Sequence, residues 1–461
     1  MITNGPPITE EMRRPILILP RRPLELQQEC YTRSRMTELS AFPPGELAKL
    51  QLEASQEYEA FKSRNLKLDM TRGKPAPAQL ELANGLNTIL DNASYVAPDG
   101  TDVRNYGGLD GLPDLKKLFG ELLGTAASNI IIGGNSSLQM MHDTIVRALM
   151  HGVPDGTGAW QNQAPKFLCP VPGYDRHFAI CQHHGIKMIP VALNREGPDM
   201  ATVESAVAND PTIKGIWCVP KYSNPTGITF SETVASQLAR MRTAASDFRI
   251  MWDNAYVVHD LYDTTSPLLN ILDACRDAGH ENRAVVFAST SKISLAGAGI
   301  AAMASSTQNV ADAKKHLGIQ TIGPDKVNQL RHLRFFKDLQ GIHLHMQKHA
   351  AILRPKFEAV ASILDQRLTS LGIAQWSKPR GGYFISLDTL PGCASRVIAL
   401  AENAGVKLTP AGATFPYGRD PEDRNIRIAP SVPELQQVEL AIQVLAGCVK
   451  LASIEKFLKR V

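Results

Sequence analysis

The sequence predicts an α/β fold: a large domain on a mostly parallel seven-stranded sheet, followed by a smaller α+β domain. Seven short apolar runs, separated by helix-length segments, indicate the sheet: 129–132, 166–169, 187–191, 214–219, 249–252, 284–288 and 300–304. Strands that are apolar along their whole length are typical of a sheet covered by helices on both faces. Because ligands bind beyond the carboxyl ends of such strands, we expect functional residues just after these runs.

The segments outside the sheet indicate the domain organisation. Helical patterns cover 45–64, 114–123, 326–368, 395–404 and 433–451, and GGYFISLD and NIRIAPS are predicted strands. We expect a segment joining the small domain, then the large domain, then a long linking helix with the small domain: 36–75, 76–325 and 326–461. Residues 1–35, rich in Pro and Arg, are interpreted as a disordered tail or as translated sequence upstream of a true start at Met36.

Composition favours a cytoplasmic protein that acts on small ligands. A net charge of +4 over 461 residues gives no concentrated basic footprint, so we expect no nucleic-acid partner. The seven cysteines are odd in number and scattered, which argues for reduced thiols and against a disulfide framework or a zinc site, and no metal is expected. No apolar run approaches the roughly 20 residues of a membrane helix, so no membrane partner is expected.

Two charged residues follow predicted strands. Lys292, in STSKISLAGAG, comes shortly after the strand 284–288. If Lys292 lies in a site without water, its amine can lose a proton and attack carbonyl groups. If it lies at the surface, its alkyl chain packs on the protein and its amine stays charged in water. Asp253, in WDNAY, directly follows the strand 249–252. A buried carboxylate there needs a cationic or hydrogen-bonding partner. That partner could be a ligand, but Asp253 could equally cap a helix N-terminus or form a structural ion pair.

Three further motifs carry weaker signals. GGNS at 133–136 follows a strand and opens a helix, which suits a phosphate but equally a capped turn. SNPTG at 223–227 has the composition of a turn. Arg427 lies within the strand of NIRIAPS, where its guanidinium could bind a carboxylate or form a structural ion pair.

In their order along the chain these motifs resemble the fold-type I aminotransferases that use pyridoxal 5′-phosphate (PLP). The resemblance runs from about Leu66 to Val449 and is closest to the bacterial aspartate aminotransferase subgroup of class I. It is carried by TRGKPAPAQLEL, RNYGGLDG, CPVPGYDRH, SNPTG, WDNAY, STSKISLAGAG, GPDKVNQL, PRGGYFISLD and NIRIAPS. It implies an aspartate transaminase that converts L-aspartate and 2-oxoglutarate to oxaloacetate and L-glutamate by a ping-pong mechanism.

The same resemblance implies roles around the cofactor ring. Lys292 would form the Schiff base with PLP and then shuttle a proton between the substrate and the cofactor. Asp253 would pair with the pyridinium nitrogen, and His177 would support Asp253 from behind. Tyr174 would stack on the ring. The ring oxygen O3′ would accept hydrogen bonds from Asn224 and Tyr256.

The phosphate and the substrate have their own expected partners. The resemblance implies phosphate contacts from Gly134, Asn135, Ser136, Ser289, Ser291 and, in a homodimer with shared active sites, Tyr106 of the partner subunit. Arg427 would bind the substrate α-carboxylate, and Gly73 would leave room for it. Class I enzymes usually place a phosphate-binding arginine where this chain has Ile300. For the distal carboxylate the candidates are Arg72, Lys74, Arg380 and, across the subunit interface, Gln320.

Other functions stay open at this level. On the same fold the chain could be an aminotransferase for aromatic or other amino acids, or a β-lyase. A PLP-sensing transcription regulator belongs to a different class, because it carries a winged-helix domain ahead of the aminotransferase-like domain. The residues ahead of Thr71 are too few and not basic enough for that domain and a linker.

Overall fold

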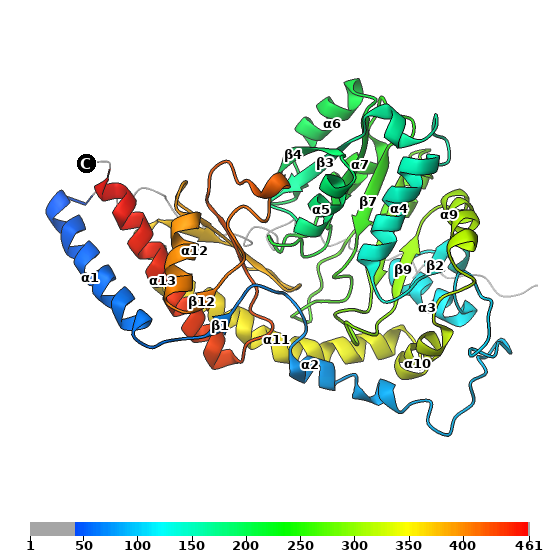
Figure 1. Cartoon of the computed structure of the whole chain (residues 1–461), viewed down its shortest axis with the longest axis horizontal. Coiled ribbons are helices and arrows are strands. Elements are labelled where there is room, and N and C mark those ends of the chain that lie inside the picture. Colours follow the sequence, from blue (N-terminus) through cyan, green and yellow to red (C-terminus); the bar gives the residue numbers. More distant parts are fainter. Residues whose placement is uncertain (1–41, 460–461) are drawn as a thin grey trace, which may run out of the picture.

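The computed structural model describes residues 42–459, so the interpretation of residues 1–35 lies outside the described residues. Figure 1 shows two lobes. The larger lobe contains the main sheet with its helices, and the smaller lobe contains both ends of the described chain. A long helix, α11 (Leu339–Leu368), runs along the base of the two lobes and connects them.

The main sheet has the strand order β2-β9-β8-β7-β6-β3-β4-β5. Neighbours from β8 to β4 are parallel, while β9 is antiparallel to both β8 and β2. The strands are β2 (Ile130–Ile132), β3 (Lys166–Val171), β4 (Lys187–Asn194), β5 (Gly197–Pro198), β6 (Ile213–Cys218), β7 (Arg249–Asp253), β8 (Ala284–Ser289) and β9 (Ala301–Ala304). All seven predicted strands are present, and the eighth, β5, is a two-residue edge strand too short to give a sequence pattern.

Helices cover both faces of this sheet, which explains its continuous apolar strands. Ile250 and Trp252 of β7 pack into one apolar cluster, and Met251 between them packs into another on the opposite face. The surrounding helices are α3 (Pro113–Leu123), α4 (Ser137–His151), α5 (Asp175–His183), α6 (Met200–Asn209), α7 (Glu232–Arg240), α8 (Ile271–Asp277), α9 (Thr307–Gln320) and α10 (Lys326–Phe336). The short helix α2 (Pro77–Glu81) packs against α11 instead.

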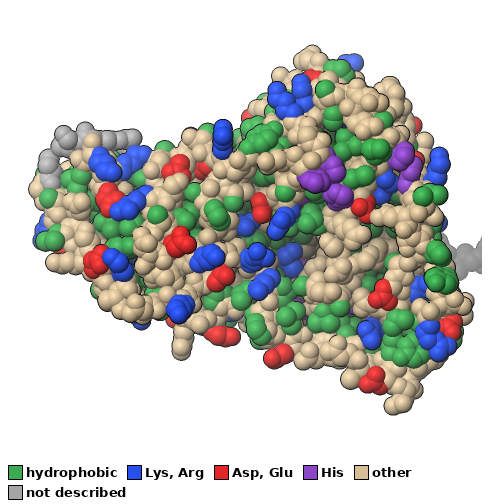
Figure 2. All heavy atoms as spheres, viewed as in Figure 1, with side chains coloured by type: hydrophobic (Ala, Val, Ile, Leu, Met, Phe, Trp, Pro, Cys, Tyr) green, Lys and Arg blue, Asp and Glu red, His purple; other side chains and the backbone are tan. Residues whose placement is uncertain are grey.

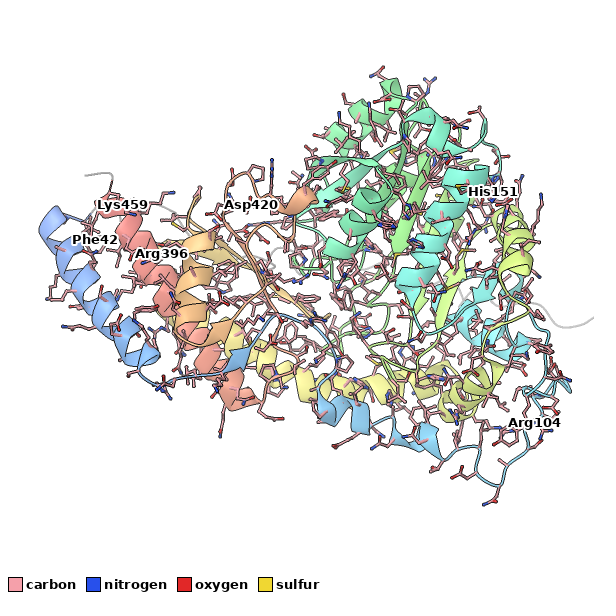
Figure 3. All side chains as sticks on the ribbon, viewed as in Figure 1. Phe42, Arg104, His151, Arg396, Asp420 and Lys459 are labelled. Atoms are coloured by element: carbon pink, nitrogen blue, oxygen red, sulfur yellow. The ribbon has the colours of Figure 1, made fainter. Side chains whose placement is uncertain are left out.

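The small lobe is built on the antiparallel sheet β10-β11-β13. Its elements are α1 (Pro44–Lys62), β1 (Leu68–Asp69), β10 (Ala374–Trp376), β11 (Ile385–Thr389), α12 (Ala394–Asn403), β12 (Val406–Lys407), β13 (Asn425–Ile428) and α13 (Leu435–Leu458). The short parallel pair β1–β12 ties the N-terminal segment to this lobe. Arg396, labelled on α12 in Figure 3, donates two hydrogen bonds of 2.9 Å to Glu455 of α13.

Helix α13 is the only described helix that is long and apolar enough to cross a membrane by length and composition. Here it is a core helix, because 72% of its most apolar window is buried. Its apolar side chains, among them Val444, Leu445 and Val449, belong to the core cluster of the small lobe.

The long helical stretch 326–368 is two helices rather than one. Lys337 ends α10 with a φ of 67°, in the left-handed region, and Asp338 then caps α11 by accepting a hydrogen bond of 2.8 Å from Gly341 N–H. Gly341 must be small, because a Cβ there would lie 1.8 Å from the Phe336 carbonyl oxygen. The linking helix of the sequence analysis therefore begins at Leu339, after a sharp turn.

Candidate active site

A cavity of about 470 Å³ receives residues from both lobes. On the face drawn in Figure 2, several Lys and Arg side chains lie beside a hollow between the lobes, which favours anionic ligands. Six predicted site residues line the cavity: Gly73, Tyr174, Asn224, Asp253, Tyr256 and Lys292. Six more were not predicted: Ser137, Leu138, Met141, Val219, Ala255 and Phe384. No sequence pattern separates these mostly apolar wall residues from residues of the core.

Lys292 lies in the turn after β8. Its side chain is partly buried and lines this cavity. Its Nζ lies 5.1 Å from the centre of the Tyr256 ring. Burial lowers the pKa of the Lys292 amine, and the negative charge of Asp253 opposes this shift without cancelling it. The amine is therefore easier to deprotonate than an ordinary lysine, as a nucleophile requires.

Asp253 ends β7 with only 2% of its surface exposed. Its Oδ2 lies 3.0 Å from His177 Nε2, and the His177 ring stacks on Trp217 with centroids 4.3 Å apart. The other oxygen, Oδ1, is buried and has no hydrogen-bond partner among the described residues. Because an orphaned buried carboxylate oxygen costs free energy, this atom fits a ligand that carries a cationic N–H group, as the pyridinium ring of PLP does.

A second group of polar residues meets where β8 and the turn after β2 end. Ser289 Oγ donates to Ser291 Oγ at 3.0 Å, and Ser291 Oγ donates to the Asn135 carbonyl oxygen at 3.2 Å. The side chains of Asn135 and Ser136 already have partners. Asn135 Nδ2 donates to the Gly297 carbonyl oxygen, and Ser136 Oγ caps α4. Backbone N–H groups at the start of α4 are therefore better placed for a phosphate than these two side chains.

Arg427 extends from β13 toward the large lobe. Its Nη1 donates to Asp175 Oδ1 at 3.0 Å and to Asn224 Oδ1 at 3.4 Å, and its guanidinium lies over the Phe384 ring at 5.0 Å. The buried Nε has no hydrogen-bond partner among the described residues. The contact with Asp175 was not predicted, since the two residues are distant in sequence and no local pattern links them.

Gly73 lies against Phe384, which changes the reason for its small size. A Cβ on Gly73 would lie 2.4 Å from Phe384 Cζ, so the ring fills the space beside this glycine. Because the Arg427 guanidinium lies over the same ring, the small size of Gly73 affects the position of Arg427 through Phe384.

The other residues named from the sequence do not line the cavity. Tyr106 is 82% exposed, and Ile300 is buried. Arg72 and Lys74 are exposed. The Arg380 guanidinium lies over the Tyr262 ring, and Gln320 donates to Asp143. Among the described residues, Lys292 is the only Lys or Arg that lines this cavity, so no second cation there takes the place of the arginine expected at position 300.

Comparison with known proteins agrees with this geometry. A family model described as aspartate amino-transferase matches residues 42–460. The aspartate aminotransferase of Corynebacterium glutamicum is 48% identical over 403 residues, which are 87% of this chain and 93% of that protein.

Solved structures agree as well. The crystal structure of an aspartate transaminase from Corynebacterium glutamicum superposes with a TM-score of 0.89 at 47% identity and covers 91% of this chain and 99% of its own. The α-aminoadipate aminotransferase of Thermus thermophilus, complexed with N-(5′-phosphopyridoxyl)-L-leucine, has a TM-score of 0.69 over 91% of this chain and 99% of its own. At 18% identity this second structure supports the fold alone. The resemblance drawn from the motifs is confirmed: the chain belongs to the aspartate amino-transferase family of fold-type I aminotransferases.

Proposed function

We propose that this chain is a PLP-dependent transaminase that moves the amino group of L-aspartate to 2-oxoglutarate by a ping-pong mechanism. The observation that carries the proposal is the pairing of Lys292 with Asp253 in one cavity: an amine with a lowered pKa, and a buried carboxylate with an unpartnered oxygen. The name of the Corynebacterium relative supports aspartate as the amino donor. PLP, when bound, supplies an electron-withdrawing ring that stabilises negative charge at the substrate Cα.

The chain's own groups would hold this cofactor and move protons beside it. Lys292 Nζ would attach the cofactor and, once released, would carry a proton from the substrate Cα to the cofactor C4′. Asp253, oriented by its hydrogen bond to His177, would keep the ring nitrogen protonated. Tyr174 would cover the ring and exclude water, and the Tyr256 hydroxyl would donate to the ring oxygen O3′.

The substrate carboxylates would meet cationic groups at the junction of the lobes. Arg427 offers its Nε and terminal nitrogens to the α-carboxylate. Asn224 already accepts from Arg427 through Oδ1, so its amide nitrogen remains as the donor toward O3′. Arg72, Lys74 and Arg380 remain the candidates for the distal carboxylate, with Gln320 acting only across a subunit interface.

We also propose a homodimer in the cytoplasm. The strong exposure of Tyr106 supports the dimer, since a tyrosine that contacts the phosphate of a partner subunit must point away from its own subunit. The loop that carries it is fixed, because Lys326 Nζ donates to the Gly107 carbonyl at 2.7 Å. The measurement is the molar mass in solution, and a monomer that is fully active when dilute would contradict shared active sites.

A donor panel tests the proposed reaction. Oxaloacetate formation from aspartate and 2-oxoglutarate is followed with malate dehydrogenase and NADH, beside glutamate formation from alanine, phenylalanine and tyrosine. We expect kcat/KM for aspartate to exceed that for each other donor by at least about tenfold, since a site that binds a second carboxylate rejects donors without one. A higher kcat/KM for phenylalanine or tyrosine would identify an aminotransferase for aromatic amino acids instead. No turnover with any donor would reject the proposed transaminase activity.

A further inference from the structure

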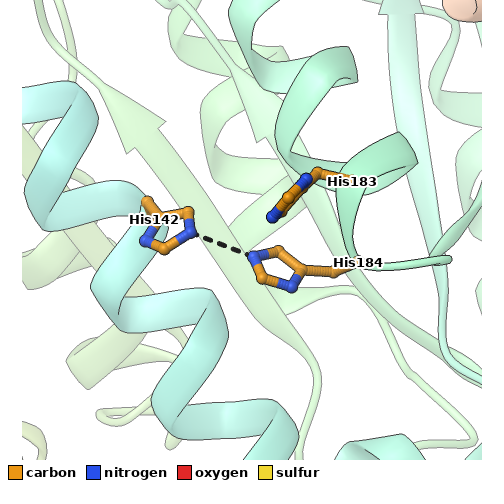
Figure 4. A group of neighbouring side chains, drawn as sticks. All are labelled: His142, His183 and His184. Carbon is orange, nitrogen blue, oxygen red and sulfur yellow. Dashed lines mark hydrogen bonds between the residues drawn. The ribbon is translucent and has the colours of Figure 1, made fainter.

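Three histidines gather on the surface where α4 meets the end of α5. His142 comes from the second turn of α4, His183 is the last residue of α5, and His184 directly follows that helix. Figure 4 shows the three rings around one small space, and Figure 2 shows histidine side chains on the exposed face near these helices. One nitrogen from each ring lies within 4.8 Å of the others. None of these residues lines the cavity of the proposed active site.

The closest pair has the spacing of two ligands on one metal ion. His142 Nε2 and His184 Nε2 lie 3.1 Å apart. Two nitrogens at about 2.0–2.1 Å from a metal are separated by about 2.9 Å at a right angle and about 3.4 Å at the tetrahedral angle. The observed distance lies between these values. His183 is exposed, and rotation of its side chain can bring its nitrogen closer by the remaining 1–2 Å or so.

The orientation of His142 is set from its other side. Its Nδ1 lies 3.3 Å from Asp143 Oδ1, and Asp143 Oδ2 accepts a hydrogen bond from Gln320 at 3.2 Å. A carboxylate on Nδ1 favours the tautomer in which the proton is on Nδ1 and Nε2 keeps its lone pair. This is the arrangement of a histidine that ligates a metal, with the carboxylate behind the ring.

The position of the cluster at the end of a helix also favours a bound cation. It lies at the C-terminal end of α5, where the carbonyl groups of the last turn favour positive charge.

We propose that His142, His183 and His184 bind one divalent transition-metal ion of the Zn²⁺ class, with a water molecule in the remaining position. Three imidazoles suit Zn²⁺, Ni²⁺ and Cu²⁺ and do not suit Mg²⁺ or Ca²⁺. The bound ion joins α4 to α5, and both helices begin at the cavity, where Ser137 lines the wall and Tyr174 directly precedes α5. Sequence spacing did not indicate this site, because its ligands come from two helices distant in the chain.

Zinc titration of the tag-free, full-length protein loaded with its cofactor tests this site. Calorimetry in the presence of excess Mg²⁺ is expected to give one Zn²⁺ per chain with a Kd below about 10 μM. His142→Gln and His184→Gln each weaken the Kd at least about tenfold, since each removes a ligand whose position is set. His343→Gln, which changes an exposed histidine of α11 outside the cluster, leaves the Kd unchanged.

Thermal unfolding provides a second reading that does not depend on catalysis. Saturating Zn²⁺ is expected to raise the Tm of the wild type and of His343→Gln by a few degrees, and not that of His142→Gln or His184→Gln. Unchanged Tm values without zinc show that the variants are folded. Absence of one-to-one binding, or equal Kd values in His142→Gln, His184→Gln and His343→Gln, would overturn the proposal.

Discussion

Replacing Asp253 with asparagine removes a buried negative charge and keeps the size of the side chain. In the wild type, Oδ2 is held by His177 and Oδ1 is left for a ligand. An asparagine can still bond to His177, but it cannot hold a proton on a ring nitrogen through a charge. The change therefore isolates the electrostatic contribution of Asp253 to the proposed reaction.

The size of the effect follows from the burial of this carboxylate. Breaking one partner of a buried, hydrogen-bonded charge pair costs about 2–5 kcal/mol, and each 1.36 kcal/mol of barrier is tenfold in rate. We therefore expect kcat/KM for aspartate to fall by about 30-fold to 5,000-fold. The upper part of this range is expected, because Asp253 is only 2% exposed and water cannot replace the lost interaction.

The assay is steady-state transamination of aspartate and 2-oxoglutarate, measured with the PLP content of each preparation. Asp247→Asn is the matched control, since Asp247 is equally buried but lies outside the cavity, bonded to Lys214 at 2.7 Å and to Trp160 at 2.9 Å. Asp247→Asn should lower the Tm and leave kcat/KM unchanged. An Asp253→Asn enzyme that keeps kcat/KM within about threefold of the wild type would show that the charge of Asp253 does not stabilise the transition state.

Three further changes test other parts of the account. Asp175→Asn should lower KM for aspartate by up to about fivefold at unchanged kcat, because a part-exposed ion pair that competes for Arg427 is worth at most about 1 kcal/mol, and a higher KM would contradict this competition. Gly73→Ala should lower kcat/KM about tenfold by displacing Phe384 from Arg427, and unchanged kinetics would show that the ring moves without cost. Burial lowers the pKa of His349 to about 4. The unfolded state therefore binds an extra proton between about pH 6.5 and pH 4, so stability from this residue falls by up to about 3 kcal/mol as the pH drops through that range. Denaturant unfolding at several pH values should show this acid loss reduced in His349→Gln, and an equal loss in both proteins would assign it to other groups.

The strands of the large lobe could be predicted because their burial on both faces leaves a direct mark in the sequence. Parallel strands such as β6 and β7 read as continuous apolar runs, and their carboxyl ends carry the polar motifs. The structure brings Lys292 and Asp253 together at this edge, since Asp253 ends β7 and Lys292 follows β8, its neighbour in the sheet.

Other parts of the site depend on contacts that no local pattern records. Phe384 belongs to the small lobe and meets Gly73 only after the chain has folded back. The ion pair of Asp175 with Arg427 likewise joins the two lobes. The break between α10 and α11 was missed because both sides have helical patterns, and the turn is made by the single left-handed residue Lys337.

Reduction with borohydride, followed by peptide mapping, identifies the lysine that carries the cofactor. The treatment fixes an imine between a lysine amine and PLP, and we expect one modified lysine, Lys292, with activity lost in proportion to the labelling. Lys221 is the informative alternative, because it is also buried with a lowered pKa but is paired with Asp260 at 3.1 Å. A label on Lys221, or activity that persists with Lys292 fully labelled, would exclude Lys292 as the residue that binds PLP.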